Sequence, residues 1–314
     1  MTRHDSVLDL IGNTPLVGVH ALSPNPNVKI WAKLEGQNPG GSSKDRIAKM
    51  MVDLAERDGV LTPGSGQIIL EPSSGNTGIG LALVAKLRGY RLRVVLPENV
   101  SIERRQLLEI FGAEVVLSPG EEGSNGAIRR AEKLAADEDE LVMLFQYGNP
   151  ANPLAHYEGT GPEILADCPE IDVFCAGLGT SGTLMGVGRY LKEHKPDTKI
   201  LAVEPPVGEL VQGLRNLDDG FVPPIFRSDV LDRKTIVRPR ESIEWTRRLL
   251  SECGVFAGIS SGAAVAGAVK FAQKMDSGTI VVLLPDGGWK YLSSGAWTDD
   301  IDVVEERATR INYW

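Results

Sequence analysis

The sequence has few cysteines, and they form no recognisable pattern. Cys168, Cys175 and Cys253 are odd in number and unevenly spaced, which argues against a disulfide framework or a cysteine zinc site. We expect them to be buried thiols. The four histidines are equally scattered and show no metal-ligand spacing such as HExxH. A metal-dependent mechanism therefore has no support in the sequence.

Long apolar runs are also missing. No stretch reaches the roughly 18 consecutive apolar residues that a membrane-spanning helix needs, and the amino-terminal residues lack the pattern of a secretory signal. We therefore expect a cytoplasmic protein without a membrane role. Acidic residues outnumber basic ones by 42 to 33, and the net charge of −9 argues against a nucleic-acid surface. Any phosphate binding must then depend on a local site.

What the 314 residues do contain is a regular alternation of short apolar runs and helical patterns. QIILEP, IGLALVAKLRG and RLRVVLP form one strand–helix–strand unit, and IDVFCAGL, TLMGVGRYLKEH and KILAVEP form another. This alternation predicts an α/β fold with parallel sheets. The Pro- and Asn-rich stretch at 147–162 interrupts the rhythm and indicates a domain boundary. Two such sheets side by side create a crevice at the carboxyl ends of their strands, where ligands usually bind.

A glycine-rich turn, GLGTSGT at 177–183, lies between a predicted strand and a predicted helix. Its exposed N–H groups, the helix dipole and the hydroxyls could hold a phosphate without lysine or arginine. The turn also spells GxGxxG, and Glu204 ends the next strand, where a ribose-binding acid would stand. A nicotinamide-dependent oxidoreductase is therefore one alternative. A turn that only packs strand against helix is another.

Lys44 stands in the first turn of a predicted amphipathic helix, directly after NPGGSS. The helix dipole disfavours a positive charge at that end and so promotes the neutral amine, which is the form that makes an imine. The alternative is a solvated lysine paired with Asp45.

Two further small polar turns precede predicted helices. SSGNTG at 73–78 supplies N–H groups and hydroxyls suited to a carboxylate, so a substrate carboxylate could bind there. GISSG at 258–262 precedes the small-residue run AAVAGAVKFA, and either of its serines could simply cap that helix.

Taken together and in this order, NPGGSSKDR, EPSSGNTG, GLGTSGT and GISSGA, with the opening IGNTPLV, resemble the cysteine synthase family of fold-type II pyridoxal-phosphate (PLP) enzymes. The resemblance extends from residue 8 to about residue 295. It implies two open, twisted parallel-sheet domains of the tryptophan synthase β-like architecture, with the active site in the crevice between them. The smaller domain would comprise 36–146, and the larger one 1–35 and 147–314 with a tail at 298–314. A homodimer is implied as well.

The resemblance also implies roles for individual residues. Lys44 would bind the PLP aldehyde as an imine, and Asn76 would form a hydrogen bond with the ring hydroxyl. Ser260 would face the ring nitrogen, where a neutral serine favours prompt β-elimination over prolonged carbanion chemistry. The phosphate would be held by Gly179, Thr180, Ser181, Gly182 and Thr183, and the substrate carboxylate by Ser73, Ser74, Thr77 and Gln146.

The implied reaction is β-replacement on an activated L-serine, either O-phospho-L-serine or O-acetyl-L-serine. Lys44 would take the α-proton, the β-substituent would leave to give an aminoacrylate, and a sulfur nucleophile would add to form L-cysteine. The nucleophile would be sulfide or the thiocarboxylate of a sulfur-carrier protein. A specialised relative that makes a different β-substituted alanine is one alternative, and a binding scaffold without turnover is another.

Several stretches, among them PENVSIERRQLLE and QYGNPAN, are most similar to the O-phosphoserine-dependent cysteine synthases of actinobacteria, often called cysteine synthase B. In that subgroup an arginine matching Arg215 selects a phosphorylated substrate, and a guanidinium is a natural partner of a phosphate monoester. The alternative is a surface ion pair with Asp218 or Asp219. The subgroup also has a tail that can enter the active site. Here the tail ends in Tyr313 and Trp314, and a frayed terminus is the alternative.

Three positions depart from the usual family pattern. Gly40 replaces a threonine, and Ser43 replaces the bulky aliphatic residue that the subgroup has beside the lysine. Ser73 replaces a threonine but keeps the hydroxyl. These changes bear on the substrate more than on the cofactor.

Overall fold

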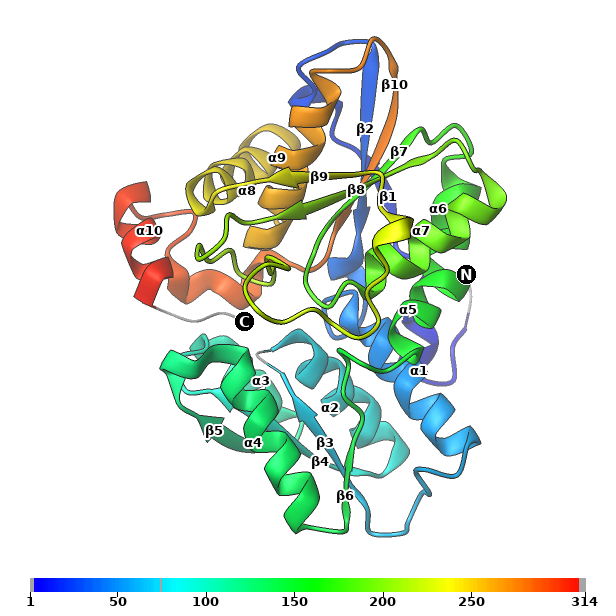
Figure 1. The fold of residues 1–314 in the computed structure, drawn as a ribbon, viewed down its shortest axis with the longest axis vertical. Coiled ribbons are helices and arrows are strands. Elements are labelled where there is room, and N and C mark those ends of the chain that lie inside the picture. The colour runs from blue at the N-terminus through cyan, green and yellow to red at the C-terminus, as the bar shows by residue number, and fades with distance from the viewer. Residues whose placement is uncertain (1–2, 74, 311–314) are drawn as a thin grey trace.

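The computed structural model describes residues 3–73 and 75–310, and their strands form two sheets. One sheet has six strands in the order β1-β2-β10-β7-β8-β9, and the other has four in the order β5-β4-β3-β6. Figure 1 shows the six-stranded sheet in the upper part of the view and the four-stranded sheet below it. Neighbouring strands pair in parallel, except β1 with β2. The predicted α/β fold with two parallel-sheet domains is confirmed, with one antiparallel edge strand added.

The six-stranded sheet is buried on both faces because helices cover both. Val173 and Cys175 of β7 pack with α8 and α9, whereas the alternate residues Phe174 and Ala176 pack with α6 and α7. Side chains of a strand alternate between faces, so a strand covered on both sides is apolar throughout. The elements are β1 (Leu16–Gly18), β2 (Val28–Leu34), β7 (Val173–Gly177), β8 (Lys199–Glu204), β9 (Arg233–Ile236), β10 (Gly278–Leu284), α6 (Gly161–Asp167), α7 (Gly182–His194), α8 (Pro239–Cys253) and α9 (Ile259–Ala272).

The four-stranded sheet is covered in the same way. Ile69 of β3 packs in a core with α1, α2 and α3, and its neighbours Ile68 and Leu70 pack with α4. The elements are β3 (Ile68–Pro72), β4 (Arg91–Pro97), β5 (Glu114–Ser118), β6 (Leu141–Met143), α1 (Lys44–Arg57), α2 (Asn76–Arg88), α3 (Ile102–Ile110) and α4 (Gly123–Asp137). All of them lie within 36–146, although the domain boundaries themselves stay a prediction.

The Pro- and Asn-rich stretch at 147–162 does interrupt the strand–helix alternation, but it is largely helical. It contains α5 (Ala151–Ala155), the π-helical turn η5 (His156–Thr160) and the start of α6. Pro153 and Pro162 fall in the first turns of α5 and α6, where a helix needs no N–H donor. The chain crosses here from the four-stranded sheet to the six-stranded sheet.

Short helical segments and one terminal helix complete the fold. They are η1 (Val7–Leu10), η2 (His20–Leu22), η3 (Glu35–Gln37), η4 (Gly120–Glu122), η6 (Ser228–Val230), η7 (Gly288–Ser294) and α10 (Ile301–Arg310). Within the described ranges no helix is long and apolar enough to cross a membrane. Cys168 and Cys175 are buried free thiols, as expected, whereas the free thiol of Cys253 is only half-buried.

Candidate active site

A pocket between the two sheets gathers the loops that follow their strands. The four-stranded side contributes Lys44, Ser73, Asn76, Thr77 and Gln146, and the six-stranded side contributes Gly179, Thr180, Ser181, Thr183, Arg215 and Ser260. Gly182 begins α7 beside this wall without lining the pocket, and Ser74 lies outside the described residues. The structure therefore brings the polar turns at 73–78, 177–183 and 258–262 together with Lys44 around one pocket.

Lys44 is the first residue of α1, and its side chain lines the pocket. Its amine lies 3.3 Å from the hydroxyl of Ser43. Burial lowers the pKa of Lys44, although Asp286 and other carboxylates act in the opposite direction. The expected alternative, an ion pair with Asp45, is not formed; the Asp45 carboxylate accepts the N–H of Gly40 at 2.5 Å instead. The lowered pKa favours the neutral, nucleophilic form of the amine.

The unusual Gly40 is explained by this contact with Asp45. A Cβ at Gly40 would stand 2.5 Å from Asp45 Oδ1, so any larger residue would displace the carboxylate. Burial raises the pKa of Asp45 to about 6, and Lys290 acts to lower it. Ser43, the second unusual residue, is fully buried and places a hydroxyl beside Lys44 where an aliphatic side chain was expected. Both departures thus alter polar contacts around the lysine.

The turn at 177–183 has the features of an anion cradle. Ser181 adopts a left-handed conformation with φ of 70°, which is costly for a residue other than glycine. Its buried hydroxyl has no hydrogen-bond partner among the described residues. Thr180 Oγ1 accepts a hydrogen bond of 3.1 Å from Asn152, and Gly182 opens α7 behind it. Strain and an unsatisfied hydroxyl at a helix N-terminus fit a bound phosphate group.

A buried histidine supports this turn from behind. His156 Nε2 lies 3.1 Å from Thr183 Oγ1, and its Nδ1 lies 2.9 Å from Thr160 Oγ1. Burial lowers the pKa of His156 well below its usual value, so the ring is neutral. A neutral imidazole donates from one nitrogen and accepts at the other, which makes a continuous chain from Thr160 to Thr183. Sequence reasoning missed His156 because its place in the chain gives no sign of this contact.

Ser73, Thr77 and Gln146 converge at the other end of the pocket. Thr77 Oγ1 donates to Gln146 Oε1 at 2.6 Å, and Ser73 Oγ accepts two N–H groups of the turn that follows it. Gln146 is itself held by Glu71, whose carboxylate accepts the backbone N–H groups of Phe145 and Gln146. Burial raises the pKa of Glu71 to about 8 against these hydrogen bonds. Glu71 therefore positions Gln146 and, through it, the hydroxyl of Thr77.

Ser260 lines the pocket wall as the second residue of α9, and it is buried. The capping role that was the alternative for Ser260 and Ser261 is not observed, because Gly258 occupies the N-cap and no side-chain capping bond is made. The hydroxyl of Ser261 lies buried without a partner in the described part of the chain.

Two charged residues that the sequence analysis did not single out flank Asn76. Asn76 Nδ2 donates to Asp286 Oδ2 at 2.7 Å, and Asn76 Oδ1 accepts from Lys290 Nζ at 2.8 Å. The hydroxyl of Tyr291 donates to the same Asp286 oxygen at 2.5 Å. All three residues follow β10, and the available signal was that ligands bind at the carboxyl ends of such strands.

Arg215 extends into the pocket from the long connection between β8 and β9. It is 8% exposed, and its guanidinium carbon lies 4.6 Å from the ring centroid of Phe221 and 5.4 Å from that of Tyr147. Within the described ranges Arg215 forms no ion pair. The alternative prediction, a surface ion pair with Asp218 or Asp219, is therefore wrong. A buried guanidinium without a carboxylate partner is suited to an anionic ligand.

Glu204 does not lie in the pocket. It ends β8 as predicted, but it is buried and pairs with Lys234 of the neighbouring strand β9 at 2.8 Å. Glu204, the acid that a dinucleotide site would require, therefore forms a structural ion pair and does not line the pocket.

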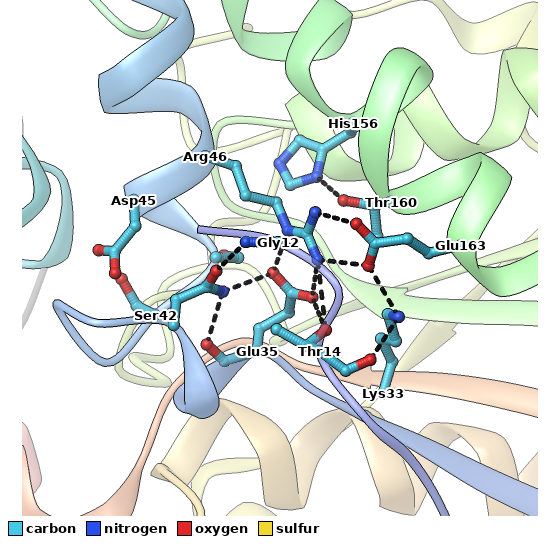
Figure 2. A network of polar contacts seen from close by, with 12 residues as sticks. Gly12, Thr14, Lys33, Glu35, Ser42, Asp45, Arg46, His156, Thr160 and Glu163 are labelled. Carbon is cyan, nitrogen blue, oxygen red and sulfur yellow. Dashed lines mark hydrogen bonds and ion pairs between the residues drawn. The ribbon is translucent and has the colours of Figure 1, made fainter. Parts of the chain in front are cut away.

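A buried charged network holds the start of α1, and its residues do not line the pocket. Figure 2 shows Arg46 between Glu35 and Glu163, with Lys33 reaching Glu163 from below. Arg46 lies 2.7 Å from Glu35 and 2.6 Å from Glu163, and Lys33 lies 2.8 Å from Glu163. The network ties α1 to β2 and α6, and so fixes the helix that begins with Lys44.

The described part of the tail forms α10, which packs on α8. Arg240 of α8 pairs with Asp302 and with Glu305, the latter at 3.2 Å. Tyr313 and Trp314 lie outside the described residues, so the predicted contact of the tail with the active site stays a prediction.

Comparisons with known proteins agree with this geometry. Residues 7–286 match the family described as pyridoxal-phosphate dependent enzyme. The chain is 42% identical over 306 residues to a cysteine synthase of Staphylococcus aureus, covering 94% of this chain and 98% of the relative. A solved O-ureido-L-serine synthase has a TM-score of 0.89 at 39% identity, covering 94% of this chain and 96% of that one. A cysteine synthase (OASS) from Entamoeba histolytica has a TM-score of 0.88 at 33% identity, covering 98% and 96%.

Proposed function

This chain belongs to the family of pyridoxal-phosphate dependent enzymes, and from that premise we propose that its amino-acid donor is O-phospho-L-serine. Its cofactor is PLP, and its reaction is β-replacement on an activated L-serine with a sulfur nucleophile, which forms L-cysteine. The observation that carries the choice of donor is the buried Arg215, which lines the pocket without an ion-pair partner among the described residues.

The residues of the pocket fit PLP in the following arrangement. The 179–183 turn, with the unsatisfied hydroxyl of Ser181, would hold the phosphate. Lys44 would bind the aldehyde carbon, Asn76 the ring oxygen and Ser260 the ring nitrogen. When bound, PLP supplies an electron sink that makes the α-proton of the amino acid acidic. Lys44 would accept that proton, and the burial that lowers the pKa of its amine favours the neutral form that can do so.

The substrate carboxylate would bind where Ser73, Thr77 and Gln146 converge, with Ser74 as a further contact outside the described residues. The backbone N–H groups at the start of α2 add the favourable end of a helix dipole. With the carboxylate held there, the β-substituent would lie against the remaining wall of the pocket. Arg215 lies on that wall.

A phosphate ester needs a compensating charge when it leaves water, and an acetate ester does not. Arg215 supplies that charge. It lies beside the rings of Tyr147 and Phe221, interacts with the Tyr147 side chain and has no carboxylate partner among the described residues, so its guanidinium suits a bidentate contact with a phosphate. Charge-assisted hydrogen bonds of this kind contribute roughly 1.5–3 kcal/mol, or about 10- to 100-fold in rate.

The substitution Arg215→Ala tests this donor assignment. We expect kcat/KM with O-phospho-L-serine to fall by about 100-fold, while kcat/KM with O-acetyl-L-serine changes by less than about threefold. Arg227→Ala is the matched control, because Arg227 lies on the same connection but is exposed and pairs with Asp229. An equal loss on both donors would show that Arg215 does not select phosphate.

One observation favours a second candidate, a family member that joins a different nucleophile to the same donor. The solved relative with a TM-score of 0.89 is named O-ureido-L-serine synthase, and Gly40 and Ser43 change the surroundings of the reactive lysine. Competition between sulfide and other small nucleophiles, followed by mass spectrometry of the products, separates the two candidates. L-cysteine as the dominant product supports the first.

The proposal also covers the nucleophile, the oligomeric state and the cellular location of the enzyme. We propose sulfide or a sulfur-carrier thiocarboxylate as the nucleophile, a homodimer as the assembly and the cytoplasm as the location. Sedimentation of the purified protein tests the dimer, and rates with sulfide against a thiocarboxylate carrier test the nucleophile.

A further inference from the structure

A second buried lysine, Lys290, lies directly behind the pocket. It belongs to η7, is 1% exposed and does not line the pocket itself. Its ammonium donates to Asn76 Oδ1 at 2.8 Å and to the backbone oxygen of Gly41 at 3.2 Å. None of the steps of β-replacement assigned above uses this residue, so its burial requires another explanation.

The surroundings of Lys290 differ from those of the other fully buried lysine, Lys33. Lys33 forms a direct ion pair with Glu163 at 2.8 Å, which offsets the loss of hydration. Lys290 has no carboxylate within ion-pair distance in the described ranges, and its two hydrogen-bond acceptors are both neutral. Burial lowers the pKa of Lys290 to about 8, while Asp286 and Asp45 act to raise it. Lys290 is thus a buried cation whose side-chain partner is the neutral amide of Asn76 and not a carboxylate.

The amide of Asn76 lies between two groups of opposite character. A carboxamide has nearly the same shape in either orientation, so its hydrogen-bond partners decide which end is oxygen. The ammonium of Lys290 can only donate, and Asp286 accepts at the oxygen that also receives the hydroxyl of Tyr291. Asn76 Oδ1 therefore faces Lys290, and Nδ2 faces Asp286 at 2.7 Å.

This arrangement leaves one hydrogen of Asn76 Nδ2 unused by the described residues, and Asn76 lines the pocket. In the reverse orientation the carbonyl oxygen would face the pocket, and it would repel an oxygen on a ligand. The two flanking charges therefore decide whether Asn76 presents a donor or an acceptor to the cofactor.

We propose that Lys290 is a positioning residue that, together with Asp286, holds the Asn76 amide so that Nδ2 donates to the ring oxygen of PLP. The proposal rests on the assigned role of Asn76 but is independent of which donor the enzyme uses. Its consequence is that the effect of Lys290 on the cofactor passes through Asn76. Loss of Lys290 should change the electronic surroundings of the PLP ring without any contact between the two.

A double-mutant cycle on the holoenzyme tests this coupling. Two quantities are measured, the visible absorption band of the bound cofactor and the fraction of cofactor retained after dilution. We expect Lys290→Met to shift the band and weaken retention by about 10-fold, because one charge-assisted hydrogen bond is lost. Asn76→Ala should do at least as much. Adding Lys290→Met to Asn76→Ala should cause no further change in either quantity.

Two controls separate positioning from general destabilisation. Lys290→Arg keeps a cationic donor and should retain the wild-type band. Lys33→Met removes a buried lysine from the network in Figure 2, and it should lower the melting temperature while leaving the band unchanged. If Lys290→Met does not fold, Lys290→Gln replaces it in the same cycle, since a glutamine amide no longer fixes the Asn76 orientation.

The outcomes are distinguishable. Full additivity of the Lys290 and Asn76 substitutions would overturn the positioning role and leave the role of Asn76 intact. A normal band in the Asn76→Ala variant would overturn both. Neither result would touch the donor assignment that rests on Arg215.

Discussion

Two basic residues in the first turn of α1, Lys44 and Arg46, stand in opposite electrostatic situations. Lys44 faces the pocket with a single hydroxyl neighbour, and burial lowers its pKa. Arg46 does not line the pocket; it is hydrogen-bonded to Glu35, Glu163 and Thr14, and the two carboxylates raise its pKa despite burial. The difference teaches that a buried cation without a carboxylate partner marks the candidate site, whereas one with two carboxylate partners marks the residues that support it.

The same contrast extends around each residue. Near Lys44, the hydroxyl of Ser181 and one oxygen of Asp286 are buried without partners among the described residues. Near Arg46, Lys33 and Thr14 complete the hydrogen bonding of both carboxylates. Buried polar groups are normally satisfied, so these two atoms beside Lys44 are suited to contact a ligand.

Lys44→Ala should have the largest effect among the substitutions that test this contrast between Lys44 and Arg46. We expect turnover to fall by at least about 1,000-fold, because the group that we propose to hold the cofactor and to move the α-proton is removed. The melting temperature should change by only a few degrees, since a desolvated amine with one weak hydrogen bond stabilises the fold little. Initial rates and thermal unfolding measure the two effects. Lys49→Ala on the exposed side of α1 is the control, and residual turnover near wild type would contradict the assignment.

Arg46→Met should show the opposite pattern, in which the main loss is in the stability of the fold. It leaves the carboxylates of Glu35 and Glu163 buried beside each other with less compensation, which costs about 3–5 kcal/mol of unfolding free energy. Chemical denaturation measures this loss. Arg57→Met, which removes an exposed ion pair with Asp58, should leave the free energy of unfolding nearly unchanged. A small loss at Arg46 would mean that the network does not support α1.

The smallest of the three effects is a pH dependence of the unfolding free energy, which arises from Glu163 in the network around Arg46. Although burial alone would raise it, hydrogen bonds from Arg46 and Lys33 hold the pKa of Glu163 at about 2, below its ordinary value of 4.5. Ionised Glu163 therefore stabilises the fold above about pH 4.5, and this contribution of about 3 kcal/mol disappears as the pH falls toward 2. Comparing unfolding free energies of wild type and Glu163→Gln between pH 6 and pH 3 measures it. Parallel curves for the two proteins would refute it.

Much of the fold and the position of the site could be predicted because the signals are local. Strand and helix follow from periods of two and 3.6 residues, and Ser73, Asn76, Ser181 and Ser260 stand in short polar turns that begin helices. In parallel sheets such turns necessarily collect at the carboxyl ends of the strands. The predicted crevice needed no knowledge of individual contacts.

Other parts of the site could not be predicted because they depend on contacts between distant residues. The family resemblance assigned Arg215 to the substrate, but the neighbouring residues alone also allowed a surface ion pair with Asp218 or Asp219; only the fold places Arg215 in the pocket, beside two aromatic rings. His156 and Lys290 gave no local sign that they would contact Thr183 and Asn76. Helical order at 147–162 was hidden by its prolines, which happen to fall in first turns.

The amino-acid order alone thus determines that Lys44 begins a helix and that polar turns follow the strands, because these features depend on neighbours within a few residues. Only the tertiary structure decided which charges are paired. Arg46 and Glu163 are 117 residues apart in the chain and yet form a buried contact, whereas Lys44, two residues earlier, is left free to react. Charge pairing depends on which distant segments the packed core brings together, and no local pattern contains that information.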